Sequence, residues 1–337
     1  MPTKQPTIYD VAKLAKVSTA TVSRVLNQPS KVNKEKKETI LSAIETLHFV
    51  PKADAVALAR KKLRKIGVVA PFFTESSFME RLKGIASVLT EQHYELVIYA
   101  VQSDEDLQGY LDMLIVNNRV DGLILLCLSL KDSMIEKLRA STLPVCFVET
   151  DVQGFDSVVI DNSNGGSLAG RFLYENGYRT PGFVGEASRR TYAAPSTEER
   201  FAGYSSFFAS KGISLEPQYV WMGDNIAQTS MAGILKILDR PDRPDCLFAS
   251  SDTMAIRILK CAVQLGITVP DDLGVIGFDD IEMAEFVNLT TVNQSLEESG
   301  ILAAETILWR LKEPDRPTKK NVIELTLHQR SSTEVKK

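Results

Sequence analysis

The chain has 337 residues, of which 44% are hydrophobic and 24% charged, and its formal net charge at pH 7 is −4. This length allows a small domain together with one large or two medium-sized domains. We find no signal peptide, no low-complexity segment and no apolar stretch long enough to span a bilayer, so we expect a cytoplasmic protein without membrane contact.

The charge is distributed unevenly along the chain. Residues 1–65 carry 14 Lys/Arg and 5 Asp/Glu, whereas residues 66–337 carry 25 and 38. A basic segment can displace the counterions of DNA, from which an acidic body gains nothing. The alternative is that these cations merely solvate a small domain. The helical pattern of the same segment favours DNA binding.

The first fifty residues predict three short helices. The first is marked by apolar residues at helical spacing: Ile8, Val11, Ala12 and Ala15. The second follows an interruption at Val17–Ser18 and is polar on its outer face. The third can be capped by Asn33 and has an apolar face formed by Ile40, Leu41, Ile44 and Leu47. Two short helices around a tight turn, the second polar outside, are typical of a helix-turn-helix.

Several segments resemble the lactose-repressor (LacI/GalR) family. They are Thr7–Ala12, Val17–Asn27 and Val50–Pro51, followed by Ala55 and Leu58. The resemblance extends over essentially the whole chain, and the N-terminal motif is highly specific. It implies a dimeric, cytoplasmic bacterial transcription regulator whose affinity for a pseudo-palindromic operator is set by a small molecule. In the family, release of the operator is the commoner response to the ligand.

The resemblance also implies which residues contact DNA. The start of the second helix enters the major groove, which assigns base contacts to Thr19, Ala20 and Arg24. Arg24 can pair with O6 and N7 of guanine. Short donors suit phosphates, which set orientation without reading sequence: Thr7, Tyr9, Ser18, Thr21, Ser23 and Asn27. Ser18 is equally suited to cap the second helix.

Residues 51–65 are predicted to form a hinge. Pro51 ends the third helix, and the alanines after it favour a helix too short to be stable alone. In the family this helix folds when two copies meet over the minor groove, where a leucine wedges between base pairs. Ala55 and Leu58 match minor-groove positions, although Leu58 would also suit ordinary packing. The family usually has Asn after the proline, where this chain has Lys52.

The rest of the chain alternates continuous apolar runs with helical segments, which predicts parallel strands covered on both faces. Five runs lie in the first half: Ile66–Ala70, Glu95–Val101, Gly122–Cys127, Val145–Val148 and Ser157–Ile160. Four lie in the second: Gly182–Gly185, Tyr219–Met222, Cys246–Ser250 and Gly274–Phe278. Two such right-handed units leave a cleft at the carboxyl ends of their strands.

The predicted fold is an all-α helix-turn-helix head with an α/β body of the periplasmic-binding-protein type, built from two doubly wound parallel-sheet subdomains. We assign residues 1–50 to the head, 51–65 to the hinge and 66–337 to an effector-binding and dimerisation body. The resemblance implies three crossings between the subdomains. Subdomain one then holds about 66–162 and 293–321, and subdomain two about 163–292 and 322–337.

Polar residues next to the predicted strands indicate a ligand site in the cleft. Ser251 and Asp279 each follow a strand, Glu149 ends another, and Arg200 opens a helix after a Ser/Thr-rich loop that reaches Ser196. Carboxylates and a guanidinium can grip adjacent hydroxyls in pairs. In the family, matching positions commonly bind a sugar or another small metabolite. The alternative for each residue is a surface ion pair or a helix cap.

Two further positions bear on the ligand. Phe78 matches an aromatic position of the family, where a ring can stack on a sugar face. After Gly223–Asp224 the family often places Phe or Trp against the effector, whereas this chain has Asn225. Exchange of an aromatic ring for an amide favours a polar, hydroxyl-rich ligand over a planar purine.

The remaining residues predict that the protein is not an enzyme. Its four cysteines lie in or near apolar runs and suit buried thiols rather than disulfides or zinc: Cys127, Cys146, Cys246 and Cys261. The three histidines are scattered, and we find neither a phosphate-cradling glycine loop nor a nucleophile–base arrangement. We therefore expect no cofactor and no metal.

We expect a homodimeric repressor of carbohydrate-utilisation genes that binds double-stranded DNA and a sugar-like effector. Dimerisation is expected on the outer helices of the body, including Phe78–Leu89. One competing interpretation is a regulator controlled by a protein co-repressor, with a vestigial cleft. A sugar-processing enzyme is the more remote alternative.

Overall fold

The computed structural model of the chain describes residues 6–27, 32–47, 49, 63–71, 74–117, 119–187, 191–224 and 226–333. The chain divides into two compact units. The first, the head, contains the N-terminal helices, and the second, the body, contains both β-sheets. The predicted hinge contacts Ala55 and Leu58 lie outside the described residues, as does Asn225.

The head contains the three predicted helices, α1 (Ile8–Leu14), α2 (Thr19–Asn27) and α3 (Lys34–Thr46). Together they close a small core of aliphatic side chains: Val11, Ala12, Ala15, Val22, Val25, Ile40 and Ala43. Such small residues allow helices this short to pack closely.

Each helix of the head is preceded by a polar residue that caps it. The Asp10 carboxylate accepts hydrogen bonds from the amide and hydroxyl of Thr7, at 2.8 and 2.6 Å. The Ser18 hydroxyl accepts from the Thr21 amide at 3.2 Å, and Asn33 Oδ1 accepts from the Glu35 amide at 3.0 Å. These bonds satisfy amides that have no partner within a helix and so fix where each helix starts. The capping alternative for Ser18 is therefore confirmed.

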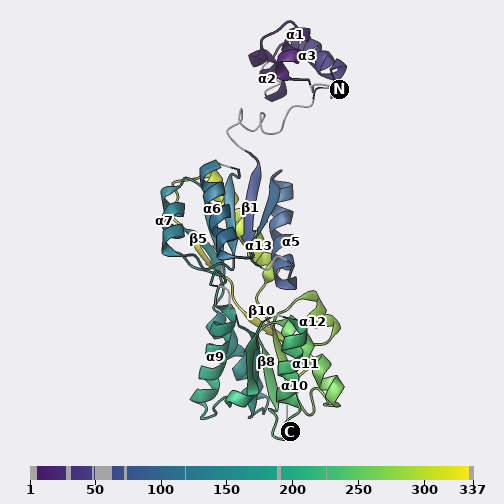
Figure 1. Cartoon of the computed structure of the whole chain (residues 1–337), viewed down its shortest axis with the longest axis vertical. Helices are drawn as coiled ribbons and strands as arrows, with labels where there is room; N and C mark the ends of the chain where they lie inside the picture. Colours follow the sequence, from purple (N-terminus) through teal and green to yellow (C-terminus); the bar gives the residue numbers. More distant parts are fainter. Residues whose placement is uncertain are drawn as a thin grey trace. The chain divides into compact units, whose positions relative to one another are not determined.

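The first sheet of the body has the strand order β2-β1-β3-β4-β5-β11. Its strands are β1 (Lys65–Ala70), β2 (Glu95–Ala100), β3 (Gly122–Leu126), β4 (Val145–Val148), β5 (Asp156–Val159) and β11 (Lys320–Val322). Three helices connect the first strands of this sheet: α5 (Ser76–Glu91), α6 (Asp104–Asn117) and α7 (Asp132–Ala140). A fourth helix, α13 (Leu296–Lys312), comes later in the chain and packs on the same sheet. In Figure 1, α5 and α13 lie on one side of this sheet and α6 and α7 on the other.

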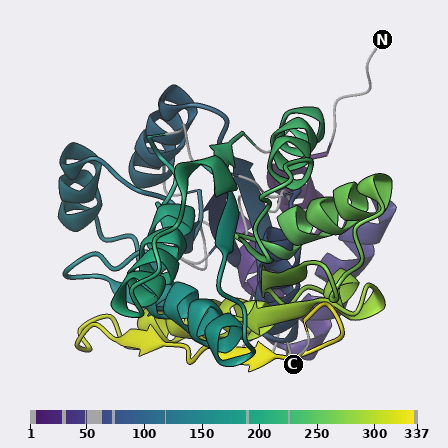
Figure 2. The ribbon, with the colours of Figure 1, turned by 90° about the horizontal axis from the view of Figure 1, so that it is seen from below.

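The second sheet repeats this order as β7-β6-β8-β9-β10-β12. Its strands are β6 (Pro181–Glu186), β7 (Val220–Gly223), β8 (Cys246–Ala249), β9 (Gly274–Asp279), β10 (Thr290–Asn293) and β12 (Thr326–His328), the last antiparallel to β10. Its helices are α8 (Asn162–Glu175), α9 (Ser196–Ser210), α10 (Ala227–Leu238), α11 (Asp252–Leu265) and α12 (Glu282–Phe286). The C-terminal segment supplies an edge strand to each sheet (Figure 2).

The nine strands predicted in the body are confirmed, with ends that differ by one residue at most. Three further strands, β10, β11 and β12, were not predicted. The last two are only three residues long and are partly exposed, so they carry no continuous apolar signal. None of the described helices is long and apolar enough to cross a membrane.

Two helix pairs of the body pack backbone against backbone through glycines. A Cβ atom at Gly300 of α13 would collide with the carbonyl oxygen of Arg81 on α5. Likewise, a Cβ atom at Gly166 of α8 would collide with the carbonyl oxygen of Arg200 on α9. Because any side chain would push the helices apart, glycine is required at both crossings. The residue contacted at each crossing is a buried arginine, Arg81 on α5 and Arg200 on α9.

Candidate functional site

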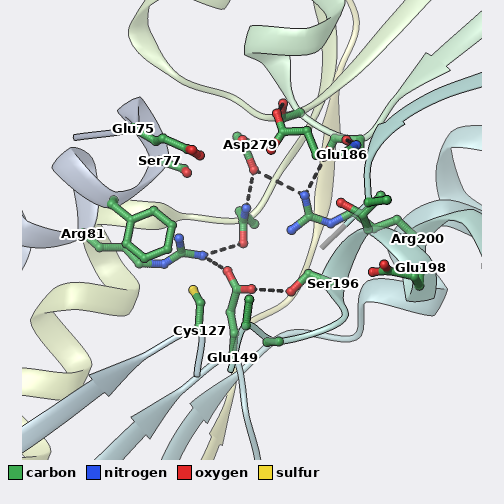
Figure 3. A pocket seen from close by; sticks show the side chains of 18 of the residues that line it. Glu75, Ser77, Arg81, Cys127, Glu149, Glu186, Ser196, Glu198, Arg200 and Asp279 are labelled. Carbon is green, nitrogen blue, oxygen red and sulfur yellow. Dashed lines mark hydrogen bonds and ion pairs between the residues drawn. The ribbon is translucent and has the colours of Figure 1, made fainter. Parts of the chain in front are cut away.

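The body contains a cavity of about 410 Å³ at the carboxyl ends of the strands of both sheets (Figure 3). We call it the main lobe. Six carboxylates line it (Glu75, Glu149, Glu186, Glu198, Asp224 and Asp279), together with two guanidinium groups (Arg81 and Arg200). A second cavity of about 240 Å³, the side lobe, shares Glu75, Ser77, Glu186, Ser251 and Asp279 with it. A concave site with convergent polar groups is the usual form of a small-molecule site.

Six of the seven residues predicted to bind an effector line the main lobe: Phe78, Glu149, Ser196, Arg200, Ser251 and Asp279. The seventh, Asn225, is outside the described residues. The structure thus brings together residues that are as far apart in the sequence as Phe78 and Asp279. Their role as ligand contacts remains a prediction.

Three residues of the main lobe have a left-handed backbone. Their φ angles are 52° at Cys127, 67° at Glu149 and 120° at Asp279, directly after or at the end of β3, β4 and β9. For residues with a Cβ atom this backbone costs about 1–3 kcal/mol each and is commonly found at functional sites. The cavity is therefore formed at the expense of local stability.

A buried ion pair lies at the centre of the main lobe. The Arg81 side chain is only 2% exposed and pairs with Glu149, whose other oxygen accepts a hydrogen bond from the Ser196 hydroxyl at 2.8 Å. Arg81 also donates to Gln294 Oε1 at 2.9 Å, and Gln294 in turn donates to Asp279. Since Arg81 and Glu149 belong to the first sheet's side and Ser196 and Asp279 to the second's, this network connects the two halves across the cavity.

Arg81 and Gln294 were not predicted as site residues. Arg81 nevertheless lies at helical spacing from Phe78 and Ile85, on the buried face of α5. A charged residue on the apolar face of a helix is rarely buried unless it has a partner. The position of Arg81 could therefore have identified it as a site residue from the sequence, whereas nothing in the sequence around Gln294 could have done so.

The Arg200 guanidinium is held by hydrogen bonds to the first residue of α8 and to the backbone that follows β8, and by a stacked ring. Its Nε donates to Asn162 Oδ1 at 2.8 Å, and its Nη1 donates to the Ser250 carbonyl at 2.7 Å. The guanidinium carbon lies 3.7 Å from the centroid of the Phe278 ring, and Nη1 is 3.6 Å from Asp279 Oδ1. Hydrogen bonds in two directions and a stacked ring leave the guanidinium a single orientation.

The electrostatics differ among the carboxylates of the main lobe. Burial tends to raise the pKa of Glu149, but the Arg81 and Arg200 cations outweigh it and hold that pKa below its usual range. For Asp279, burial dominates over the same two cations and raises the pKa. For Glu186, burial and the nearby charges of Glu75 and Asp279 raise the pKa to about 7. The carboxyl group of Glu186 is therefore the one in this part of the cavity whose ionisation burial opposes most clearly.

Replacement of Glu186 by glutamine should stabilise the ligand-free protein at pH 8 but not at pH 4.5. In the folded state the pKa is about 7, against an ordinary value of 4.5, so the carboxyl group costs stability as the pH rises through this range. The gain should approach roughly 3 kcal/mol at pH 8. Urea denaturation at both pH values measures it, with the exposed Glu175→Gln as the control. An equal effect at both pH values would contradict the prediction.

On the head, the residues predicted to contact DNA lie on and around the outer side of α2. Ala20 and Arg24 are exposed, and Thr19, Thr21 and Ser23 are partly exposed. Thr7 and Ser18 are exposed as well, and Tyr9 is 73% exposed, although it is a large aromatic residue. An exposed tyrosine next to short hydroxyl donors suits contact with phosphates. The side chain of Asn27 is outside the described residues.

A helix-turn-helix head and a two-sheet body around a polar cavity define the class of DNA-binding regulators that respond to a ligand. Comparison with known proteins supports this class. Residues 7–52 match the family described as "Bacterial regulatory proteins, lacI family", and residues 171–333 match the "Periplasmic binding protein-like domain".

The transcriptional repressor PurR of Aliivibrio salmonicida is 31% identical over 313 residues, which cover 91% of this chain and 92% of that protein. The ribose operon repressor of Haemophilus influenzae is 30% identical over 97% of this chain and 98% of its own length. The structure of the regulator CelR with cellobiose has a TM-score of 0.70 at 27% identity and covers 97% of this chain and 99% of that one. The chain belongs to the LacI family of bacterial regulatory proteins, and it is a DNA-binding transcriptional regulator.

Proposed function

We propose that the protein is a homodimeric repressor of carbohydrate-utilisation genes whose operator affinity is lowered by a hydroxyl-rich ligand in the main lobe. The observation that carries this proposal is the network from Ser196 through Glu149, Arg81 and Gln294 to Asp279. A ligand that enters the cavity must compete for these bonds between the two halves of the body. It would therefore bind two arrangements of the halves unequally, as regulation by a ligand requires.

The lining of the main lobe supports a sugar as the ligand. Among the described residues that line it, Phe78 is the single aromatic one, whereas carboxylates, hydroxyls and guanidinium groups are numerous. One ring can stack on a sugar face, but a planar purine is usually held between apolar surfaces on both sides. The names of two relatives point the same way, since one solved complex contains cellobiose and one relative is a ribose operon repressor.

We assign residues 1–50 to the DNA-binding head, 51–65 to a hinge and 66–337 to the effector-binding and dimerisation body. Two heads would read the halves of a pseudo-palindrome, with Ala55 and Leu58 of each hinge in the minor groove. Since operator DNA in a bacterium is cytoplasmic, the protein would act there. We propose no enzymatic activity.

The direct test is to measure the affinity of the full-length protein for a pseudo-palindromic operator, by fluorescence anisotropy, with and without a panel of sugars. The proposal predicts that at least one sugar weakens operator binding. A protein co-repressor is the second candidate. If no sugar alters operator affinity, but a protein partner does, the small-molecule mechanism is wrong.

Replacement of Arg24 by alanine should weaken discrimination between the operator and a site with one altered guanine by about tenfold to a hundredfold. The reason is that a bidentate contact between arginine and guanine contributes about 1–3 kcal/mol of discrimination. Competition binding at fixed salt measures this ratio. Lys13→Ala, which removes another cation of the head at the end of α1, should leave the ratio unchanged. Unchanged base preference in Arg24→Ala would refute the assigned contact.

A further inference from the structure

The main lobe holds more negative than positive groups, and its cations are already engaged. Six carboxylates and two guanidinium groups line it among the described residues. Arg81 bonds to Glu149 and Gln294, and Arg200 bonds to Asn162 and the Ser250 carbonyl. Each guanidinium already bonds to groups of the protein, and the carboxylates outnumber the guanidinium groups, so an anionic ligand would add to an excess of negative charge.

Three of the carboxylates belong to one region of the second sheet's half. Glu186 ends β6, and Asp224 follows β7 directly; because Glu186 is paired with Gly223, both lie at the same edge of the sheet. Glu198 is in the first turn of α9, next to Arg200 in Figure 3. We call Glu186, Glu198 and Asp224 the acidic wall.

Two carboxylate oxygens of the acidic wall have no hydrogen-bond donor. Within the described part of the chain, the buried oxygens Glu198 Oε2 and Asp224 Oδ1 accept no hydrogen bond. Glu186 accepts one long bond, from the Ser251 hydroxyl at 3.4 Å. Arg257 lines the side lobe nearby, but its Nη1 donates to the Ser230 hydroxyl at 3.0 Å. Buried carboxylate oxygens without donors are costly, so a ligand that supplies donors there gains affinity.

We propose that the effector carries a positively charged amino group beside its hydroxyls, as an amino sugar does, and that the acidic wall binds this group. The inference deepens the proposed function and rests on it. Neutral hydroxyls could satisfy the free oxygens, but they would leave the excess negative charge buried. An ammonium group offers three N–H donors and also cancels charge. Phosphorylated or acidic sugars would add negative charge and are excluded by the same reasoning.

The test is calorimetry on the full-length protein with matched ligands at pH 7.5 and low salt. Each set contains a hexose, its 2-amino form, its N-acetylated form and its 6-phosphate, in the gluco and galacto series. We expect the amine to bind at least about tenfold more tightly than the parent hexose, because a charge-assisted bond replaces a neutral one. The N-acetylated form has the same nitrogen without its charge and should bind more weakly than the amine.

Two variants locate the preference. Glu186→Gln and Asp224→Asn should each reduce the preference for the amine over the hexose to less than about threefold, whereas the exposed Glu175→Gln should keep it. If the hexose, its N-acetylated form or its phosphate binds as tightly as the amine, the inference is wrong and the proposed function stands. If no ligand of either series binds but another sugar of the panel releases the operator, the inference is wrong and the proposed function stands; if no sugar releases the operator, both are wrong. If the preference persists in both variants, the acidic wall is not its cause.

Discussion

Replacement of Arg81 by methionine should lower the free energy of unfolding of the body by roughly 3–5 kcal/mol, because it leaves Glu149 buried without its nearest cation. Methionine retains much of the volume of the arginine side chain, so the effect is electrostatic rather than a cavity. The loss includes the bond that Arg81 donates to Gln294. Urea denaturation at pH 7.5 measures it.

Two controls distinguish the buried pair from ion pairs in general. The double variant Arg81→Met/Glu149→Gln should regain more than half of the lost stability, since it removes the uncompensated charge as well. Lys83→Met removes a cation from the same helix, where Lys83 contacts Glu297 of α13 at 2.8 Å and is exposed. That exposed pair should contribute almost nothing. Equal losses in Arg81→Met and Lys83→Met would show that the network is not important for stability.

Replacement of Arg200 by alanine should reduce the affinity for the proposed sugar effector by about a hundredfold or more. A charge-assisted hydrogen bond contributes about 1.5–3 kcal/mol, and this guanidinium also holds Asn162 and the Ser250 carbonyl in place around the cavity. Calorimetry with that sugar measures the affinity, and anisotropy measures whether the sugar still releases the operator. The operator should remain bound at ligand concentrations that release it from the unaltered protein.

The control for Arg200 is Arg171→Ala, which removes an exposed arginine from α8 and should not alter ligand affinity. Arg200→Lys keeps the charge but loses the planar guanidinium group, so its ligand affinity should fall between that of the unaltered protein and that of Arg200→Ala. If Arg200→Ala binds the sugar normally while its thermal unfolding is unchanged, the proposed role of this residue is wrong.

Most strands of the body could be predicted, because they are continuous apolar runs in the sequence. Val145–Val148 and Cys246–Ala249 are buried on both faces, so each is a continuous apolar stretch whose limits are easy to find. The edge strands β11 and β12 escape the same reasoning, because each alternates exposed and partly exposed residues over only three positions. Their pairing depends on neighbours more than 30 residues away.

The candidate site was predictable where chemistry coincides with the end of a strand, as at Glu149 and Asp279. Arg81 was missed because a helix interior gives no such positional signal, although its place on an apolar face was unusual. Gln294 was missed because an amide after a short strand has no distinctive chemistry until its two partners are known. The excess of carboxylates over cations depends on three-dimensional proximity, and only the folded cavity reveals it.

The glycines at the two helix crossings determine where mutations can abolish the response to a ligand. Gly166 and Gly300 do not line the cavity, yet each meets the backbone of the residue that carries a guanidinium group into it. A single-base change that adds even one methyl group there would displace that arginine. Loss of the response to a ligand can therefore arise at codons whose residues never contact that ligand, so the mutations that inactivate the response are not confined to the cavity lining.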